Sequence, residues 1–174
     1  MKIYGGDQSR MDAAKIILGK RVLIVDDEKD VLDSLTELLN LCKIDTATSF
    51  DKAKELLGKN YYDIAILDIM GVDGFKLLEI AIENKIPALM LTANALTPES
   101  LKKSVEDGAA YFVPKDQMEN IDTYIADVIE AKEKNKNPWV RWMGRLGGVL
   151  DVLFTGPDWR EREKDFWKKY RDNY

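Results

Sequence analysis

The chain has 174 residues, of which 45% are hydrophobic and 33% charged, and its formal net charge is −5. This composition is typical of a globular domain, and no apolar run approaches the roughly 18 residues of a membrane span. The sequence holds no histidine and a single cysteine. It therefore excludes Ser-His-Asp and Cys-His catalysis, histidine metal sites and an internal disulfide. Any bound metal should be a hard ion held by oxygen atoms.

The charge is divided unevenly along the chain. Residues 1–134 carry a net charge of −8, and residues 135–174 carry a net charge of +3. An acidic body disfavours nucleic-acid binding, and residues 1–21 lack the long apolar core of a secretory signal. We therefore expect a cytoplasmic protein that binds neither nucleic acid nor membranes.

The patterns divide the chain into a leader at 1–20, a domain at 21–134 and an amphipathic helical extension at 135–174. In the leader, residues 13–18 could form a helical turn. In the domain, short apolar runs that end in polar residues predict buried strands at 22–25, 64–67, 88–91 and 111–113, with a shorter strand at 44–48. Helical spacing of apolar residues predicts helices at about 31–39, 53–57, 75–82, 98 onward and 121–129. Five such strand–helix units predict a parallel sheet with helices on both faces.

Polar residues follow four of the predicted strands. They are Asp26 and Asp27, Asp68, Thr92, and, after one proline, Lys115. In an open α/β sheet, ligands bind outside the carboxyl ends of the strands. We therefore expect three carboxylates, a hydroxyl and an ammonium to converge in one crevice. Such a group can hold a divalent cation and a phosphoryl group.

The motifs around these residues resemble those of the response-regulator receiver domain, the chemotaxis-regulator-like phosphoacceptor of two-component signalling. They are Leu23-Ile24-Val25-Asp26-Asp27-Glu28, Leu67-Asp68, Leu91-Thr92-Ala93 and Pro114-Lys115. The resemblance covers about residues 20–134. It implies a flavodoxin-like, doubly wound α/β fold with a five-stranded parallel sheet in the order 2-1-3-4-5, here followed by a C-terminal helical segment. The family usually places a proline after the lysine, whereas here Pro114 precedes Lys115.

The resemblance also implies a metal-dependent phosphoacceptor. Asp68 would be the phosphorylated carboxylate. Mg²⁺ or Mn²⁺ would be held by Asp26, Asp27, Asp68 and the backbone carbonyl of Met70. The phosphoryl donor would be a sensor histidine kinase. The protein would then be a signalling switch, and its only chemistry would be phosphotransfer to itself and dephosphorylation.

Three further residues would carry the response to phosphorylation. By the resemblance, Thr92 and Lys115 would contact the phosphoryl group, and Thr92 with Phe112 would form the switch. If Thr92 moves inward, Phe112 can fill the vacated space and change the surface near the last strand. An aromatic residue in a buried strand is also ordinary core material, so this role for Phe112 stays one of two interpretations.

Two other classes of function remain open. A Mg²⁺-dependent phosphatase could form the same aspartyl phosphate, although such enzymes commonly show Asp-x-Asp, and here Asp68 is followed by Ile69 and Met70. A phosphate-independent scaffold could retain the acidic pocket as a relic.

The extension has its own pattern, and all four tryptophans of the chain lie in it. Residues at helical spacing predict an amphipathic helix over about 139–154, with a candidate interaction face of Trp139, Trp142, Met143, Leu146 and Leu150. Thr155-Gly156-Pro157 predicts a break, and Asp158 could cap a last helix. The apolar face could pack on the chain itself, form a homodimer or dock a downstream protein partner.

Overall fold

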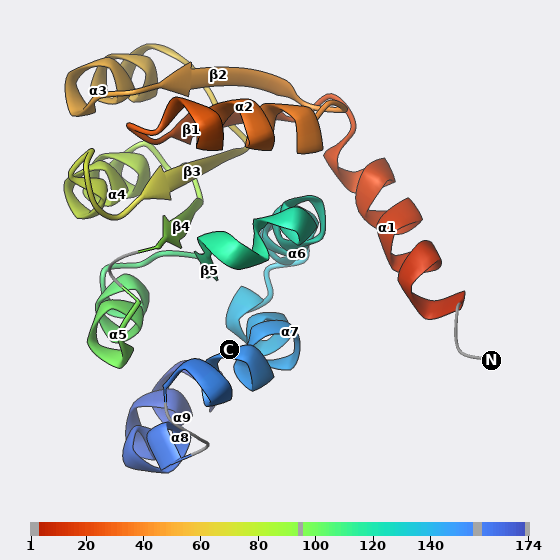
Figure 1. Ribbon diagram of the computed structural model, residues 1–174, viewed down its shortest axis with the longest axis vertical. Coiled ribbons are helices and arrows are strands. Elements are labelled where there is room, and N and C mark those ends of the chain that lie inside the picture. Colours follow the sequence, from red (N-terminus) through yellow and green to blue (C-terminus); the bar gives the residue numbers. More distant parts are fainter. Residues whose placement is uncertain (1–3, 94–95, 155–157, 173–174) are drawn as a thin grey trace.

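The computed structural model describes residues 4–93, 96–154 and 158–172. Five parallel strands form one sheet in the order β2-β1-β3-β4-β5 (Figure 1). The strands are β1 (Arg21–Val25), β2 (Lys43–Ala47), β3 (Ile64–Asp68), β4 (Ala88–Thr92) and β5 (Tyr111–Pro114). The predicted α/β class and the strand order 2-1-3-4-5 are confirmed.

The interior strands are buried on both faces. Every residue of β3 and β4 is buried, as a continuous apolar run predicts for a parallel strand between two helical layers. One layer contains α2 (Lys29–Leu38) and α6 (Ile121–Glu133), and the other contains α3 (Phe50–Lys59), α4 (Gly74–Glu83) and α5 (Pro98–Glu106) (Figure 1). Helix α5 begins with a capping box, in which the Thr97 side chain accepts a hydrogen bond from the Ser100 amide.

The leader is more ordered than the sequence predicts. Residues Tyr4–Ile17 form a 14-residue helix, α1, rather than a single turn. Helix α1 packs against α6, and its Ala13 and Ile17 are buried (Figure 1). The partner of this helix lies more than 100 residues away, and most helical stability comes from tertiary packing rather than from local propensity. The sequence pattern of the leader alone therefore predicts a shorter helix than the one that forms.

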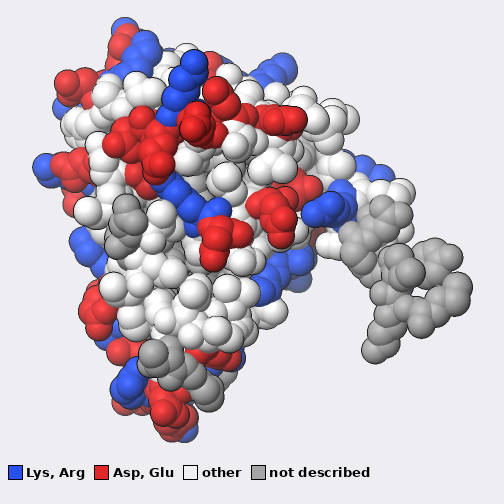
Figure 2. Space-filling model, viewed as in Figure 1, with Lys and Arg blue, Asp and Glu red and all other residues white. Residues whose placement is uncertain are grey.

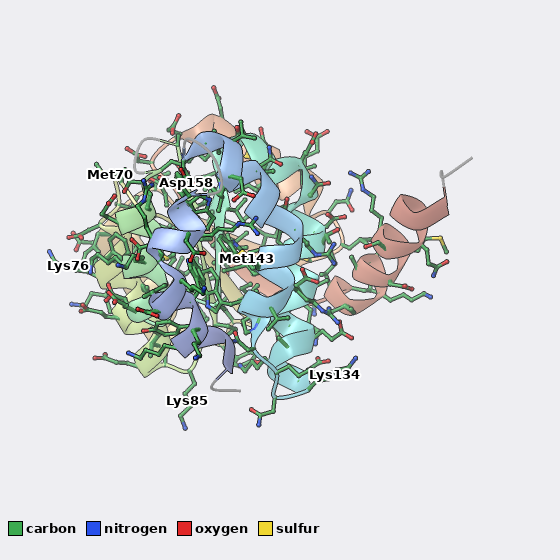
Figure 3. All side chains as sticks on the ribbon, turned by 90° about the horizontal axis from the view of Figure 1, so that it is seen from below. Met70, Lys76, Lys85, Lys134, Met143 and Asp158 are labelled. Carbon is green, nitrogen blue, oxygen red and sulfur yellow. The ribbon has the colours of Figure 1, made fainter. Side chains whose placement is uncertain are left out.

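The extension folds into three helices on the same molecule. They are α7 (Pro138–Leu153), α8 (Asp158–Arg162) and α9 (Lys164–Asp172). The single last helix expected after Asp158 is two helices, while the predicted break at Thr155-Gly156-Pro157 lies outside the described residues. Seen from below, α7 and α9 lie side by side across the molecule, with Met143 between them (Figure 3). The apolar face of α7 thus packs on the chain itself.

Helix α7 covers the edge of the sheet at β5. The indole nitrogens of Trp139 and Trp142 donate hydrogen bonds to the carbonyls of Ala109 and Phe112, at 3.1 and 2.7 Å. Edge strands present unpaired backbone groups, and here two carbonyls in or just before β5 receive side-chain donors. Among the described helices, none combines the length and the apolar character needed to cross a lipid bilayer.

Candidate functional site

The residues singled out in the sequence converge at the carboxyl end of the sheet. Asp68 ends β3, Thr92 ends β4, and Lys115 follows directly after β5. A pocket of about 370 Å³ at this end is lined by Asp27, Glu28, Asp68, Met70, Gly71, Ala93 and Lys115. Figure 2 shows acidic side chains gathered over the part of the molecule where β1, α2 and β3 lie in Figure 1. The crevice is therefore strongly acidic.

Lys115 joins three of the acids. Its ammonium lies 2.8 Å from Asp26 Oδ2, 2.7 Å from Glu28 Oε1 and 3.3 Å from Asp68 Oδ1. Its side chain is only 12% exposed, so these contacts are made largely out of water. The preceding proline ends β5 and does not keep the ammonium from the site.

The surroundings shift the pKa values of Asp68 and Lys115. Burial, reinforced by the negative charge of Asp26, raises the pKa of Asp68 to about 6, against the opposing effect of Lys115. Burial alone would lower the pKa of Lys115. Hydrogen bonds to Asp26 and Glu28 and the charge of Asp68 outweigh it, and the pKa of Lys115 is raised. Lys115 therefore stays a cation at every physiological pH.

The donor set fits a hard divalent cation. Asp26, Asp27 and Glu28 each offer a carboxylate oxygen, and these oxygens lie within 4.8 Å of one another. The Met70 carbonyl accepts one hydrogen bond, from the Val72 amide at 2.8 Å, and a carbonyl oxygen has a second lone pair to give. Several carboxylates and a carbonyl are the ligands that Mg²⁺ takes in proteins.

Two glycines make room for these groups. Gly71 has a φ of +76°, and a Cβ there would lie 2.6 Å from the carboxylate of Asp27. At Gly74, the first residue of α4, a Cβ would lie 2.1 Å from the backbone oxygen of Asp68. The loop after β3 therefore wraps closely around both acids.

Gly71→Ala should weaken Mg²⁺ binding at least tenfold. The methyl group would push the Asp27 carboxylate from its place, and alanine resists a positive φ. Isothermal titration with Mg²⁺ measures the change. Gly58→Ala is the matched control, because nothing lies within 4 Å of a Cβ in that position of α3, and it should leave Mg²⁺ affinity unchanged. Equal affinities in the two variants would place Asp27 outside the metal site.

Mg²⁺ affinity should also fall in mild acid. With a pKa of about 6, Asp68 is ionised at pH 7.5 and mostly protonated at pH 5, where a proton competes with the cation. We expect the apparent Kd for Mg²⁺ at pH 5 to be about tenfold higher than at pH 7.5, at constant ionic strength. A Kd that does not change over this range would contradict a buried, ligating Asp68.

Both proposed switch residues are buried. Thr92 is 1% exposed and lies opposite Pro114 in the strand register, while Phe112 is fully buried and lies opposite Met90. The structure thus places Phe112 in the core, and a switch role for it stays a prediction.

Sequence reasoning missed two residues of functional interest. Glu28 belongs to a receiver-like motif that gives it no role of its own, yet its carboxylate pairs with the ammonium of Lys115. Asp127, in the apolar stripe of α6, is a buried acid that pairs with Arg145. The signal for Asp127 was a charge among apolar residues at helical spacing, but its partner lies on another helix.

The family model of the response regulator receiver domain matches residues 22–126. The chain belongs to this family. Among curated proteins, this receiver domain is 34% identical over 131 residues to the two-component response regulator ARR10 of Arabidopsis thaliana and 35% identical over 128 residues to ARR12 of the same plant. The matches cover 69% and 68% of this chain but only 24% and 21% of those proteins. The chain thus spans about a quarter of the length of these relatives.

Solved structures show the same fold. A CheY-like receiver domain protein from Methanospirillum hungatei JF-1 aligns with a TM-score of 0.61 at 24% identity, covering 67% of this chain and 98% of that one. A putative response regulator from Chloroflexus aurantiacus J-10-fl aligns with a TM-score of 0.57 at 26% identity, covering 64% of this chain and 98% of that one. These alignments leave about a third of this chain without a counterpart.

Proposed function

We propose that this receiver domain accepts a phosphoryl group on Asp68 from a partner histidine kinase and signals through the resulting change in conformation or assembly. One observation carries the proposal. A nearly buried carboxylate ends the central strand β3, with the Lys115 ammonium 3.3 Å from one oxygen and a cluster of acids beside it. A phosphatase lacks a comparable observation, since no second acid stands two residues after Asp68.

The proposed step forms one bond and breaks one. An oxygen of the ionised Asp68 attacks the phosphorus of a phosphohistidine, and an acyl phosphate forms. The P–N bond breaks, and its electron pair returns to the imidazole nitrogen, which takes up a proton. Lys115 offsets the charge of the incoming group and holds it near Asp68.

Several acids of the chain would hold a cation at this place. Asp26, Asp27 and Asp68 would provide carboxylate oxygens, and Met70 would provide its carbonyl. When bound, Mg²⁺ would supply positive charge to the transferring phosphoryl group. Thr92, at the end of β4, directly follows Leu91, the register partner of Asp68, and would offer its hydroxyl to the new phosphoryl group.

Intact mass spectrometry tests the proposal. The full chain, incubated with acetyl phosphate and Mg²⁺, should gain the mass of one phosphoryl group, and peptide mapping should place it on Asp68. In this reaction a P–O bond breaks and acetate leaves. A parallel sample with EDTA should gain nothing. If acetyl phosphate and a histidine-kinase donor both fail to add a group, the scaffold interpretation is the better one.

A further inference from the structure

The helices α7, α8 and α9 lie over the face of the domain that α5, β5 and α6 share. We call these helices (138–153, 158–162 and 164–172) the C-terminal cap. Viewed from below, the cap lies across the β5 side of the molecule (Figure 3). It touches each element of the face: Lys102 of α5 pairs at 2.8 Å with Glu163, the residue that joins α8 to α9, and α7 contacts both β5 and α6.

An aromatic contact seats the cap on β5. Trp142 is fully buried, and its indole donates to the Phe112 carbonyl at 2.7 Å. Trp167 of α9 stacks on Trp142, with ring centroids 5.5 Å apart and an angle of 14° between the planes. The positions of α7 and α9 therefore depend in part on one backbone carbonyl of β5.

A buried ion pair adds a second point of attachment. The Asp127 side chain on α6 is 2% exposed, and Arg145 of α7 donates to it at 2.5 and 3.0 Å. The hydroxyl of Tyr111 in β5 donates to the same carboxylate at 3.0 Å. A buried charge left without its partner is costly, so a loosened α7 would leave Asp127 poorly compensated.

Strand β5 connects the contact between Phe112 and Trp142 to the proposed phosphorylation site. Phe112, whose carbonyl holds Trp142, is three residues before Lys115, whose ammonium is held by Asp26, Glu28 and Asp68. Phosphorylation replaces the single charge of the Asp68 carboxylate with a total charge of about −2 on phosphoryl oxygens that are strong acceptors. Lys115 would then turn from Asp26 and Glu28 toward the phosphoryl oxygens, and the end of β5 would shift with it.

We propose that docking of the C-terminal cap and phosphorylation of Asp68 oppose each other through β5. This inference rests on the proposed function, because it needs the phosphoryl group at Asp68. The effect is reciprocal by thermodynamic linkage: phosphorylation loosens the cap, and a loosened cap favours phosphorylation.

Hydrogen exchange of the full chain, followed by mass spectrometry, tests whether phosphorylation loosens the C-terminal cap. The protein is compared before and after treatment with acetyl phosphate and Mg²⁺, and the intact mass of the same sample reports phosphoryl addition. Backbone amides of residues 138–153 should exchange about fivefold faster, or more, in the phosphorylated protein. Because all four tryptophans lie in 139–167, indole fluorescence should change in parallel.

Substitutions test whether a loosened C-terminal cap favours phosphorylation of Asp68. Trp142→Phe keeps an aromatic ring but removes the donor to Phe112, and it should raise the phosphorylated fraction severalfold at limiting acetyl phosphate. Lys102→Gln, which removes the ion pair with Glu163 and the contact of the Lys102 ammonium with the Phe166 ring, should raise it about twofold. Lys103→Gln is the matched control. It makes the same change on the next residue of α5, whose partner Asp107 belongs to the domain itself, and it should have no effect.

The outcomes separate the two proposals. Phosphoryl addition without faster exchange in 138–153 overturns the coupling and leaves the proposed function intact. Equal phosphorylated fractions in wild type and Trp142→Phe would likewise overturn the coupling and leave the proposed function intact. Absence of phosphoryl addition from both acetyl phosphate and a histidine-kinase donor overturns the proposed function, and the coupling falls with it.

Discussion

Asp68→Asn is expected to abolish phosphoryl addition, from one group per chain to none by intact mass. The amide occupies nearly the same volume but has no ionised oxygen to attack phosphorus. Asp33→Asn, a change of the same kind at an exposed position of α2, should be phosphorylated like the wild type. Continued phosphorylation of the Asp68 variant would assign the acceptor to another carboxylate of the acidic cluster.

The same variant should be more stable than the wild type, which rules out misfolding as the cause of its inactivity. In the folded protein the pKa of Asp68 is about 6, above the value of about 4 for an unfolded aspartate. Between these two values the native state binds more protons, so stability falls as pH rises from 4 to 6. Asparagine removes this cost. In Mg²⁺-free buffer at pH 7.5, urea unfolding should show a gain of about 1–2 kcal/mol.

Trp142→Ala should lower the free energy of unfolding by about 3–5 kcal/mol, measured by urea titration with far-UV circular dichroism. The substitution opens a cavity under α7, removes the stacking with Trp167 and leaves the Phe112 carbonyl without its indole donor. An unsatisfied buried acceptor adds to the cost of lost packing. Helix α7 is therefore expected to act as part of the domain core.

Val152→Ala is the control for this change on the same helix. Val152 is 80% exposed, so its loss should alter the free energy of unfolding by less than about 0.5 kcal/mol. If Trp142→Ala changes the free energy of unfolding as little as Val152→Ala does, the burial of α7 against β5 contributes nothing to stability. The C-terminal cap is then held on β5 more weakly than its contacts indicate.

The strands were predictable because burial on both faces leaves a direct mark on the sequence, whereas their order came from the resemblance to the receiver family. Runs such as residues 64–67 are apolar throughout, and each ends at a polar residue where the chain leaves the core. The meeting of Asp26, Asp68 and Lys115 followed, since parallel strands bring their carboxyl ends to one side of the sheet. Here local pattern and topology point to the same site.

Other features depend on partners that no local pattern reveals. Helix α1 owes its burial to α6, and the pairing of Asp127 with Arg145 joins two helices whose orientation is set only by folding. The choice among self-packing, homodimer and partner docking for the extension could not be made from its apolar stripe. An amphipathic face shows that something covers it, but its periodicity carries no information about what does.

The two edges of the sheet are protected in different ways. At β5, the indoles of Trp139 and Trp142 occupy carbonyls that another strand could otherwise use. At β2 the edge remains open, but Lys43 and Thr46 are exposed and Asp45 pairs with Arg21, so a strand approaching there meets charged and polar side chains. Aggregation by strand addition is thus disfavoured at both sides. Loss of the C-terminal cap would leave β5, an apolar strand, as the side from which such growth could begin.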